Sequence, residues 1–66
     1  MKLLINGETQ QVPDTLSVAA LLKTLGYDSQ SIAVAVDGTF VPRHQYTTQT
    51  LKEAQTLDIV APMQGG

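Results

Sequence analysis

The fold of this chain is decided at its start, in residues 1–12, which read MKLLINGETQQV. Residues 1–5 are rich in strand-forming apolar side chains, and residues 8–12 can return as a second strand. Between them, Asn6-Gly7 is the strongest short signal for a hairpin, because both residues tolerate the positive φ that a type I′ turn requires. The opening therefore predicts two antiparallel strands joined by a two-residue turn.

The same turn sets the register of the predicted hairpin. It places Ile5 opposite Glu8 and Leu3 opposite Gln10. Because apolar residues of the first strand then have polar partners, we expect the second strand to lie at the edge of a sheet. Pro13 should end that strand, since proline has no N–H to donate.

A helix is predicted after the hairpin. Four apolar residues recur at the spacing of one helical face: Val18, Leu21, Leu22 and Leu25. Ser17 before them is a favourable N-cap, because its hydroxyl can accept a hydrogen bond from an unpaired backbone N–H. Gly26 after them suits the left-handed position that ends many helices. We expect a short helix over residues 18–25 that needs a sheet to pack on.

Three further segments complete the expected sheet. Residues 32–36 have the alternating pattern of a strand, with large side chains on one face and alanines on the other. Asp37-Gly38 turns the chain into a short return strand over residues 39–41. Residues 43–51 have no clean period and indicate a loop or a single helical turn. Residues 57–60 form the last strand.

The order of these elements predicts an α+β fold. A mixed sheet of four to five strands, covered on one face by one helix, is the economical way to bury the apolar stripes. The first strand should then lie centrally, beside the last strand. This arrangement is the β-grasp, or ubiquitin-like, fold. We expect it to occupy residues 1–61, with residues 62–66 as a flexible C-terminal tail.

The composition argues against several classes of function. The 66 residues contain no Cys, and a small domain without disulfides fits a reducing cytoplasm. The four basic residues are scattered and the formal net charge is −2, which argues against a nucleic-acid partner. No apolar stretch approaches the length of a membrane span, and the N-terminus lacks a signal-peptide pattern. His44, the only histidine, has no neighbouring ligands for a metal site and no partners for a catalytic set.

The remaining candidate for chemistry is the C-terminus, Met63-Gln64-Gly65-Gly66. Glycine lacks a side chain, so Gly65 and Gly66 can enter a channel too narrow for other residues, and Gln64 and Met63 follow them as the rest of the threading tail. Adenylation would turn the terminal carboxylate into an electrophile, and a sulfur nucleophile could then displace AMP to leave a thiocarboxylate. Its sulfur would be ionised and nucleophilic near neutral pH, as in a thiolate. Glycines are also common in mobile chain ends, so an inert tail remains open.

A carrier of this kind also needs a surface that a partner can recognise. Strand alternation predicts five apolar residues on the sheet face away from the helix: Leu4, Ala33, Ala35, Val41 and Val60. Small apolar residues would make this face a flat patch that an activating enzyme could cover. Isolated exposed apolar residues are also ordinary on protein surfaces, so the patch alone does not establish a partner.

Over nearly its whole length the chain resembles the ThiS family, the sulfur carriers of thiamine biosynthesis. Residues 1–8 resemble the family's first hairpin, and residues 17–22 resemble the start of its helix. The most specific segment is residues 32–43, which ends in Phe-Val-Pro-Arg and is followed by Tyr46 where tryptophan is frequent. The Gly65-Gly66 end completes the pattern.

The sequence departs from the family pattern at three places. Ala20 stands where glutamate often completes a capping box, and Glu53-Ala54-Gln55 replaces the usual Asp-Gly-Asp turn. These two changes concern local stability. The end reads Met63-Gln64 where Val-Ala is common, which concerns the fit of the tail to a partner's channel.

The resemblance implies a protein cosubstrate that is not itself an enzyme. An ATP-dependent adenylating enzyme, related to the ubiquitin-activating (E1) enzymes, would adenylate Gly66. Sulfur from cysteine, supplied by a cysteine desulfurase or another sulfur donor, would form the thiocarboxylate, and thiazole synthase would take that sulfur into the thiazole ring. Gly66 would be the modified residue and Gly65 would keep its approach clear. ATP and Mg²⁺ would bind to the partner, and no cofactor or metal to this chain.

Three other functions remain compatible with the residues. The small subunit of molybdopterin synthase shares the fold, the tail and the thiocarboxylate, but it is usually longer, and the Val-Pro-Arg segment favours the thiamine branch. A ubiquitin-like interaction module with an inert tail is the second. A small enzyme is the third, and the want of a catalytic set in so short a chain argues against it.

Residues after Pro62 should be disordered in the free protein, because they follow the last predicted strand and have no predicted partner in the sheet. Backbone NMR order parameters should fall below about 0.6 there and stay at about 0.85 in the domain. Rigid values through Gly66 would show instead that the tail is a structural element.

Overall fold

The computed structural model describes residues 1–14 and 16–61. The elements in these residues are, in order, β1 (Lys2–Ile5), β2 (Glu8–Gln11), α1 (Val18–Leu25), β3 (Ala33–Val36), β4 (Thr39–Phe40), the 3₁₀ helix η1 (Arg43–Gln45) and β5 (Thr56–Val60). Each strand differs from its predicted range by one residue at one end. The predicted tail, residues 62–66, lies outside the described part of the chain.

The strands form one mixed sheet of five strands, in the order β2-β1-β5-β3-β4. β1 pairs antiparallel with β2, and the predicted register is confirmed, with Ile5 opposite Glu8 and Leu3 opposite Gln10. β5 runs parallel to β1 on one side and antiparallel to β3 on the other. The first and last strands are therefore neighbours inside the sheet, and β2 is an edge strand. This is the predicted β-grasp fold.

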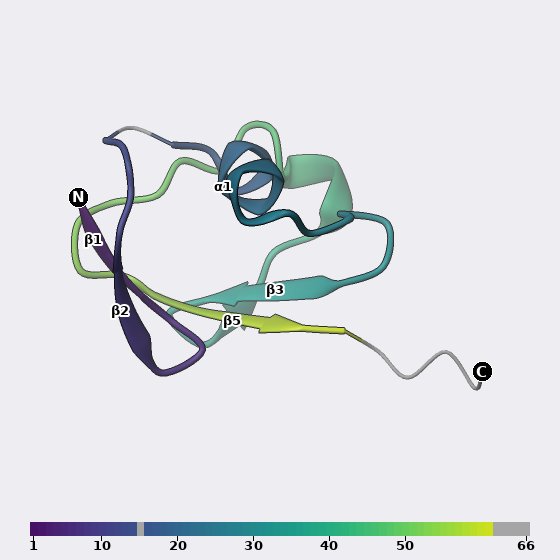
Figure 1. Cartoon of the computed structure of the whole chain (residues 1–66). Coiled ribbons are helices and arrows are strands. Elements are labelled where there is room, and N and C mark those ends of the chain that lie inside the picture. Colours follow the sequence, from purple (N-terminus) through teal and green to yellow (C-terminus); the bar gives the residue numbers. More distant parts are fainter. Residues whose placement is uncertain (15, 62–66) are drawn as a thin grey trace.

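The helix α1 covers one face of the sheet (Figure 1). Ser17 caps it by accepting the N–H of Ala20 at 3.1 Å, and Gly26 ends it in the left-handed region at φ 84°. Both ends of α1 lie where the sequence predicts them. The core between the helix and the sheet consists mainly of side chains from these two layers: Leu3, Ile5, Val18, Leu21, Leu22, Val34, Val36, Leu57 and Ile59.

The segment between η1 and β5 supplies hydrogen-bond acceptors for the first turn of α1. The N–H of Val18 donates to the carbonyl of Gln49 at 2.9 Å, and the N–H of Ala19 donates to the carbonyl of Tyr46 at 2.8 Å. The first N–H groups of a helix have no partner within it, so these two carbonyls satisfy donors that would otherwise be unpaired. The side chains of Tyr46 and Leu51 are buried in the core. The irregular segment is thus a structural part of the helix layer.

The turn before β5 shows the effect of its departure from the family pattern. Ala54 has a φ of 69°, in the left-handed region, which costs a residue with a Cβ roughly 1–2 kcal/mol. The usual glycine at this position would avoid that cost. The turn is tied to β1, because Ala54 donates its N–H to the carbonyl of Lys2 at 2.8 Å and Lys2 donates its N–H to Glu53 Oε1 at 3.0 Å. These hydrogen bonds offset the strain at Ala54.

Candidate functional site

The chain leaves the fold at the end of β5, just before the predicted reactive C-terminus. β5 ends at Val60, and Ala61 is the last residue that the structure describes. Figure 1 shows β5 running out of the centre of the sheet, past the turn between β1 and β2. The four residues with predicted roles in the tail lie outside the described residues: Met63, Gln64, Gly65 and Gly66.

Two turn residues hold β5, one from each side. Asn6, at φ 51°, accepts the N–H of Ile59 through Oδ1 at 2.7 Å and donates its own N–H to the carbonyl of Leu57 at 2.9 Å. Asp37, at φ 50°, accepts the N–H of Thr56 through Oδ1 at 2.9 Å and donates its N–H to the carbonyl of Thr56 at 2.7 Å. Asn and Asp tolerate this left-handed backbone better than most residues. Both turns therefore position the strand that leads to the C-terminus.

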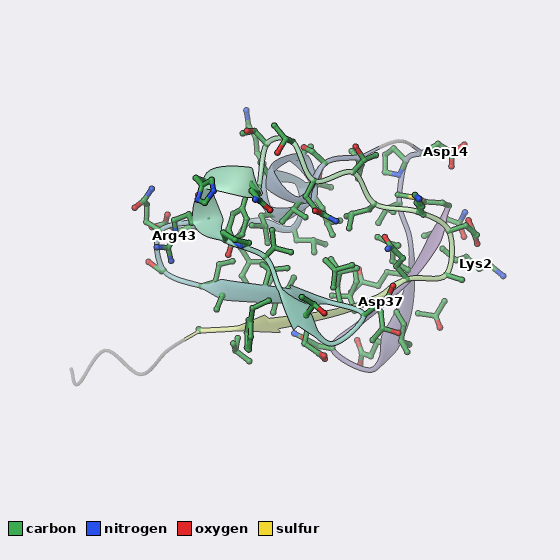
Figure 2. All side chains as sticks on the ribbon, turned by 180° about the vertical axis from the view of Figure 1, so that it is seen from behind. Lys2, Asp14, Asp37 and Arg43 are labelled. Carbon is green, nitrogen blue, oxygen red and sulfur yellow. The ribbon has the colours of Figure 1, made fainter. Side chains whose placement is uncertain are left out.

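Arg43 belongs to the segment that most specifically resembles the family. It stabilises the loop next to the end of β5. Its Nε donates to the carbonyl of Ser29 at 2.9 Å, and a terminal guanidinium nitrogen donates to the carbonyl of Ile32 at 3.1 Å. Ile32 directly precedes β3, whose first residue, Ala33, pairs with Val60. Figure 2 shows Arg43 at the end of the sheet from which the chain leaves β5. The guanidinium thus orders the loop beside the last residue of β5.

The sheet face opposite α1 is the predicted partner surface. Val60 is 50% exposed and Leu4 is 36% exposed, and the residues before them in their strands, Ile59 and Leu3, point into the core. Ala33 pairs with Val60 and is half-buried. Val60 and Ala33 are therefore neighbours on the face that the helix leaves uncovered, whereas Leu4 lies beside Thr56, with the exposed Asp58 between Thr56 and Val60 along β5.

β4 contributes a different residue to this face from the one predicted. Ala35 pairs with Phe40 across the turn, so Val41 follows opposite Val34 and donates its N–H to the Val34 carbonyl at 2.8 Å. Val41 accordingly packs against the core, not on the outer face. Ala35 lies on the outer face but is only 5% exposed, whereas Phe40 beside it is 66% exposed. Counting the register across the two-residue Asp37-Gly38 turn would have identified Phe40 from the sequence.

Asp14 and His44 lie outside the strands of the sheet. The amino group of Met1 donates to Asp14 Oδ1 at 2.8 Å, and this hydrogen bond, together with the ammonium charge, lowers the pKa of Asp14. Figure 2 shows Asp14 at the opposite end of the molecule from Arg43. His44 is exposed within η1. In the described ranges, no group of three or more His, Asp or Glu side chains is placed to hold a metal, and no helix is long and apolar enough to cross a membrane.

Comparison with known proteins establishes the family. A family model described as the ThiS family matches residues 3–66, which include the di-glycine end. The chain belongs to the ThiS family. This is the family of the sulfur carriers of thiamine biosynthesis, and the resemblance seen in the sequence is confirmed.

Solved structures of ThiS proteins share the fold of this chain. The crystal structure of the thiamine biosynthesis protein ThiS from Geobacter metallireducens has a TM-score of 0.88 and 26% identity, over the whole of both chains. An NMR solution structure of a thiamine biosynthesis protein from the same organism has a TM-score of 0.84 and 26% identity, over all of this chain and 88% of that one. The predicted β-grasp architecture is confirmed.

One curated relative of this ThiS chain is a larger protein. A thiazole synthase from Paramagnetospirillum magneticum is 39% identical over 66 residues. The similar region covers 100% of this chain and 20% of that protein, so the chain spans about a fifth of the length of this relative. A domain similar to this one is thus present within a thiazole synthase chain.

Asn6→Gly should weaken the hold of the β1–β2 turn on β5. Glycine keeps the positive φ but removes the acceptor for the N–H of Ile59, so we expect the free energy of unfolding to fall by about 1 kcal/mol. Urea denaturation measures this loss, and the Ile59 amide should exchange faster with solvent. Asn6→Asp keeps the acceptor and is the matched control; equal stability of the two variants would contradict the anchoring role.

Proposed function

We propose that this chain carries sulfur as a thiocarboxylate on Gly66. The observation that supports this most directly is the extent of the family match, which runs through residue 66 and so includes both terminal glycines. The fold supports it as well, because the strand before this end is held on both sides by hydrogen bonds from Asn6 and Asp37. A strand fixed by hydrogen bonds on both sides, in a chain that ends in two glycines, suits a domain that presents its own C-terminus to another enzyme.

The chemistry has two steps, and neither uses a side chain of the carrier. In the first, an oxygen of the Gly66 carboxylate attacks the α-phosphorus of ATP and pyrophosphate leaves, which gives an acyl-adenylate. In the second, a nucleophile at the oxidation level of sulfide attacks the acyl carbon and AMP leaves. ATP and Mg²⁺ bind to the adenylating partner, and a cysteine desulfurase or another donor supplies the sulfur. A desulfurase delivers persulfide sulfur, so a thiol, such as excess cysteine, supplies the two electrons that bring it to the level of sulfide and is itself oxidised to a disulfide. Gly65 keeps the approach to the carbonyl clear.

Thiazole synthase is the acceptor that we propose for the sulfur. The Paramagnetospirillum magneticum relative is itself named a thiazole synthase and contains a region similar to the whole of this chain. A carrier joined to its acceptor meets it at a high effective concentration, which is a physical advantage of placing the two in one polypeptide. In this proposal the chain serves the same class of acceptor in the cytoplasm, where its ATP-dependent activation takes place.

The partner enzymes recognise the open sheet face in this proposal. Phe40, Val60 and Leu4 are large apolar residues that remain exposed there, at 66%, 50% and 36%. Exposed aromatic residues that a partner covers often dominate the free energy of binding. We therefore expect Phe40 to contribute most of the binding free energy on this face. Smaller residues beside it, such as Ala35, would leave the surrounding surface flat.

Incubation with ATP, Mg²⁺, cysteine, a desulfurase and the adenylating enzyme of the same cell should convert the carboxylate into a thiocarboxylate. Intact-mass spectrometry would show the increase that replacement of one oxygen by sulfur produces, and a reaction without ATP is the control. A chain without Gly65 and Gly66 should not react, while its circular dichroism spectrum should stay the same. An unchanged mass of the full chain with every adenylating enzyme of that cell would refute the proposal and favour an inert interaction module.

Phe40→Ser should raise the KM of the adenylating enzyme for the carrier by about thirtyfold, since truncation of an aromatic anchor costs on the order of 2 kcal/mol. The stability of the carrier should change little, because Phe40 is 66% exposed. Tyr27→Ser is the matched control: Tyr27 is 38% exposed but follows the end of α1, away from the sheet face. An equal KM for both variants would remove Phe40 from the partner surface.

A further inference from the structure

β5 extends further than its neighbour β1. β1 pairs with β5 as far as Ile5 and Leu57 and then turns away at Asn6. β5 continues to Val60, which still pairs with Ala33 of β3 on its other side. Figure 1 shows this last part of β5 extending past the turn between β1 and β2. The end of β5 therefore has a strand neighbour on one side only.

The hydrogen bonds of Asn6 identify the backbone groups on the open side. Asn6 contacts both the carbonyl of Leu57 and the N–H of Ile59, so these groups point towards β1. Backbone groups of alternate residues in a strand point to the same side, so the carbonyl of Ile59 and the N–H of Ala61 also face this side. Within residues 1–14 and 16–61, neither of these two groups has a hydrogen-bond partner.

We propose that an extended segment of the adenylating enzyme pairs with this open edge of residues 59–61. The inference rests on the proposed function, because it describes how the enzyme that activates Gly66 grips the chain. Addition of a strand to a free sheet edge is an established way for a protein to hold an extended partner, and its affinity comes from main-chain hydrogen bonds. Either orientation of the added strand uses the N–H of Ala61.

The position of the edge points to this occupant. Ala61 precedes Gly66 by five residues, which at full extension span about 17 Å, so a segment paired here lies close to the site that receives the carboxylate. Val60, half-exposed on the outer face, lies beside the edge and gives the added strand an apolar contact. Pro62 has no N–H, so the row of donors ends at Ala61 and pairing beyond it is disfavoured.

Main-chain pairing would serve activation of the tail in a specific way. A strand held in register fixes the direction in which the following residues extend, and orientation of this kind lowers the barrier to attack on ATP. Because main-chain bonds do not depend on side-chain identity, the grip also tolerates the Met63-Gln64 sequence, which departs from the family pattern. The added strand would thus orient the C-terminal residues where they leave β5, in addition to any orientation that the partner's channel gives them.

Ala61→Pro tests the pairing, because it removes the N–H at a position that follows β5. Ala61→Val is the matched variant, since it keeps the N–H and also favours an extended backbone. In carrier-dependent ATP–pyrophosphate exchange with the adenylating enzyme, the KM for the Pro variant should exceed that for the Val variant by about tenfold, the effect of one lost hydrogen bond. Urea denaturation should give similar stabilities for the two chains.

Amide hydrogen exchange of the unmutated chain provides a second measurement. Saturation with the adenylating enzyme should slow exchange of the Ala61 amide at least about tenfold, as expected for an N–H drawn into a sheet. A KM ratio near one, together with an unprotected Ala61 amide in the complex, would overturn the pairing while leaving the carrier function intact. Absence of exchange activity with the unmutated chain would overturn the proposed function and the pairing together.

Discussion

The insertion of β5 between β1 and β3 is the constraint on which the rest of the structure depends. The β1–β2 and β3–β4 hairpins form locally, but they become one sheet only when the last strand pairs with both. β5 runs parallel to β1 and antiparallel to β3, so β2 and β3 run in the same direction, and α1 is the crossover that joins them. Leu57 and Ile59 then point into the core at 0% and 6% exposure. The strand that leads to the C-terminus is therefore also part of the centre of the core.

Both hairpin turns contribute to this insertion. Each has a short polar residue in left-handed backbone, Asn6 in one and Asp37 in the other, followed by glycine. The side-chain oxygens of these two residues accept N–H groups of β5 from opposite sides, at 2.7 Å and 2.9 Å. The sequence predicted Asp37 as a turn residue. The structure agrees and adds that the same carboxylate anchors the last strand.

The proposed function separates recognition from chemistry along the chain. In this proposal the reacting carboxylate belongs to Gly66, so the folded domain would have to offer only a surface for the partner and a fixed position at which the C-terminal residues leave the sheet. The exposed apolar residues around Phe40 are suited to the first of these tasks, and the anchored end of β5 is suited to the second. Arg43 illustrates the same distinction, because this charged residue of the most specific segment orders a loop beside Val60 through two backbone carbonyls. A charged residue in a distinctive motif can thus be structural.

The sequence by itself determined the local elements and the family. The two Asx-Gly turns, the helix with its Ser17 cap and Gly26 end, the register of the first hairpin and the di-glycine end all depend on residues close together in the chain. Local preferences of backbone and side chain suffice for such features. The position of Phe40 on the outer face, in place of Val41, also follows from the register of a two-residue turn, so the sequence alone was sufficient to predict it.

Only the tertiary structure decided how distant segments complete one another. The oxygen of Asn6 that receives the N–H of Ile59 joins residues 53 positions apart, and the carbonyls of Tyr46 and Gln49 complete the start of a helix far before them. The open edge at the end of β5 likewise results from the unequal lengths of two strands from opposite ends of the chain. Such contacts depend on how the packed layers meet, and no local propensity specifies which backbone group a side chain will find across the sheet.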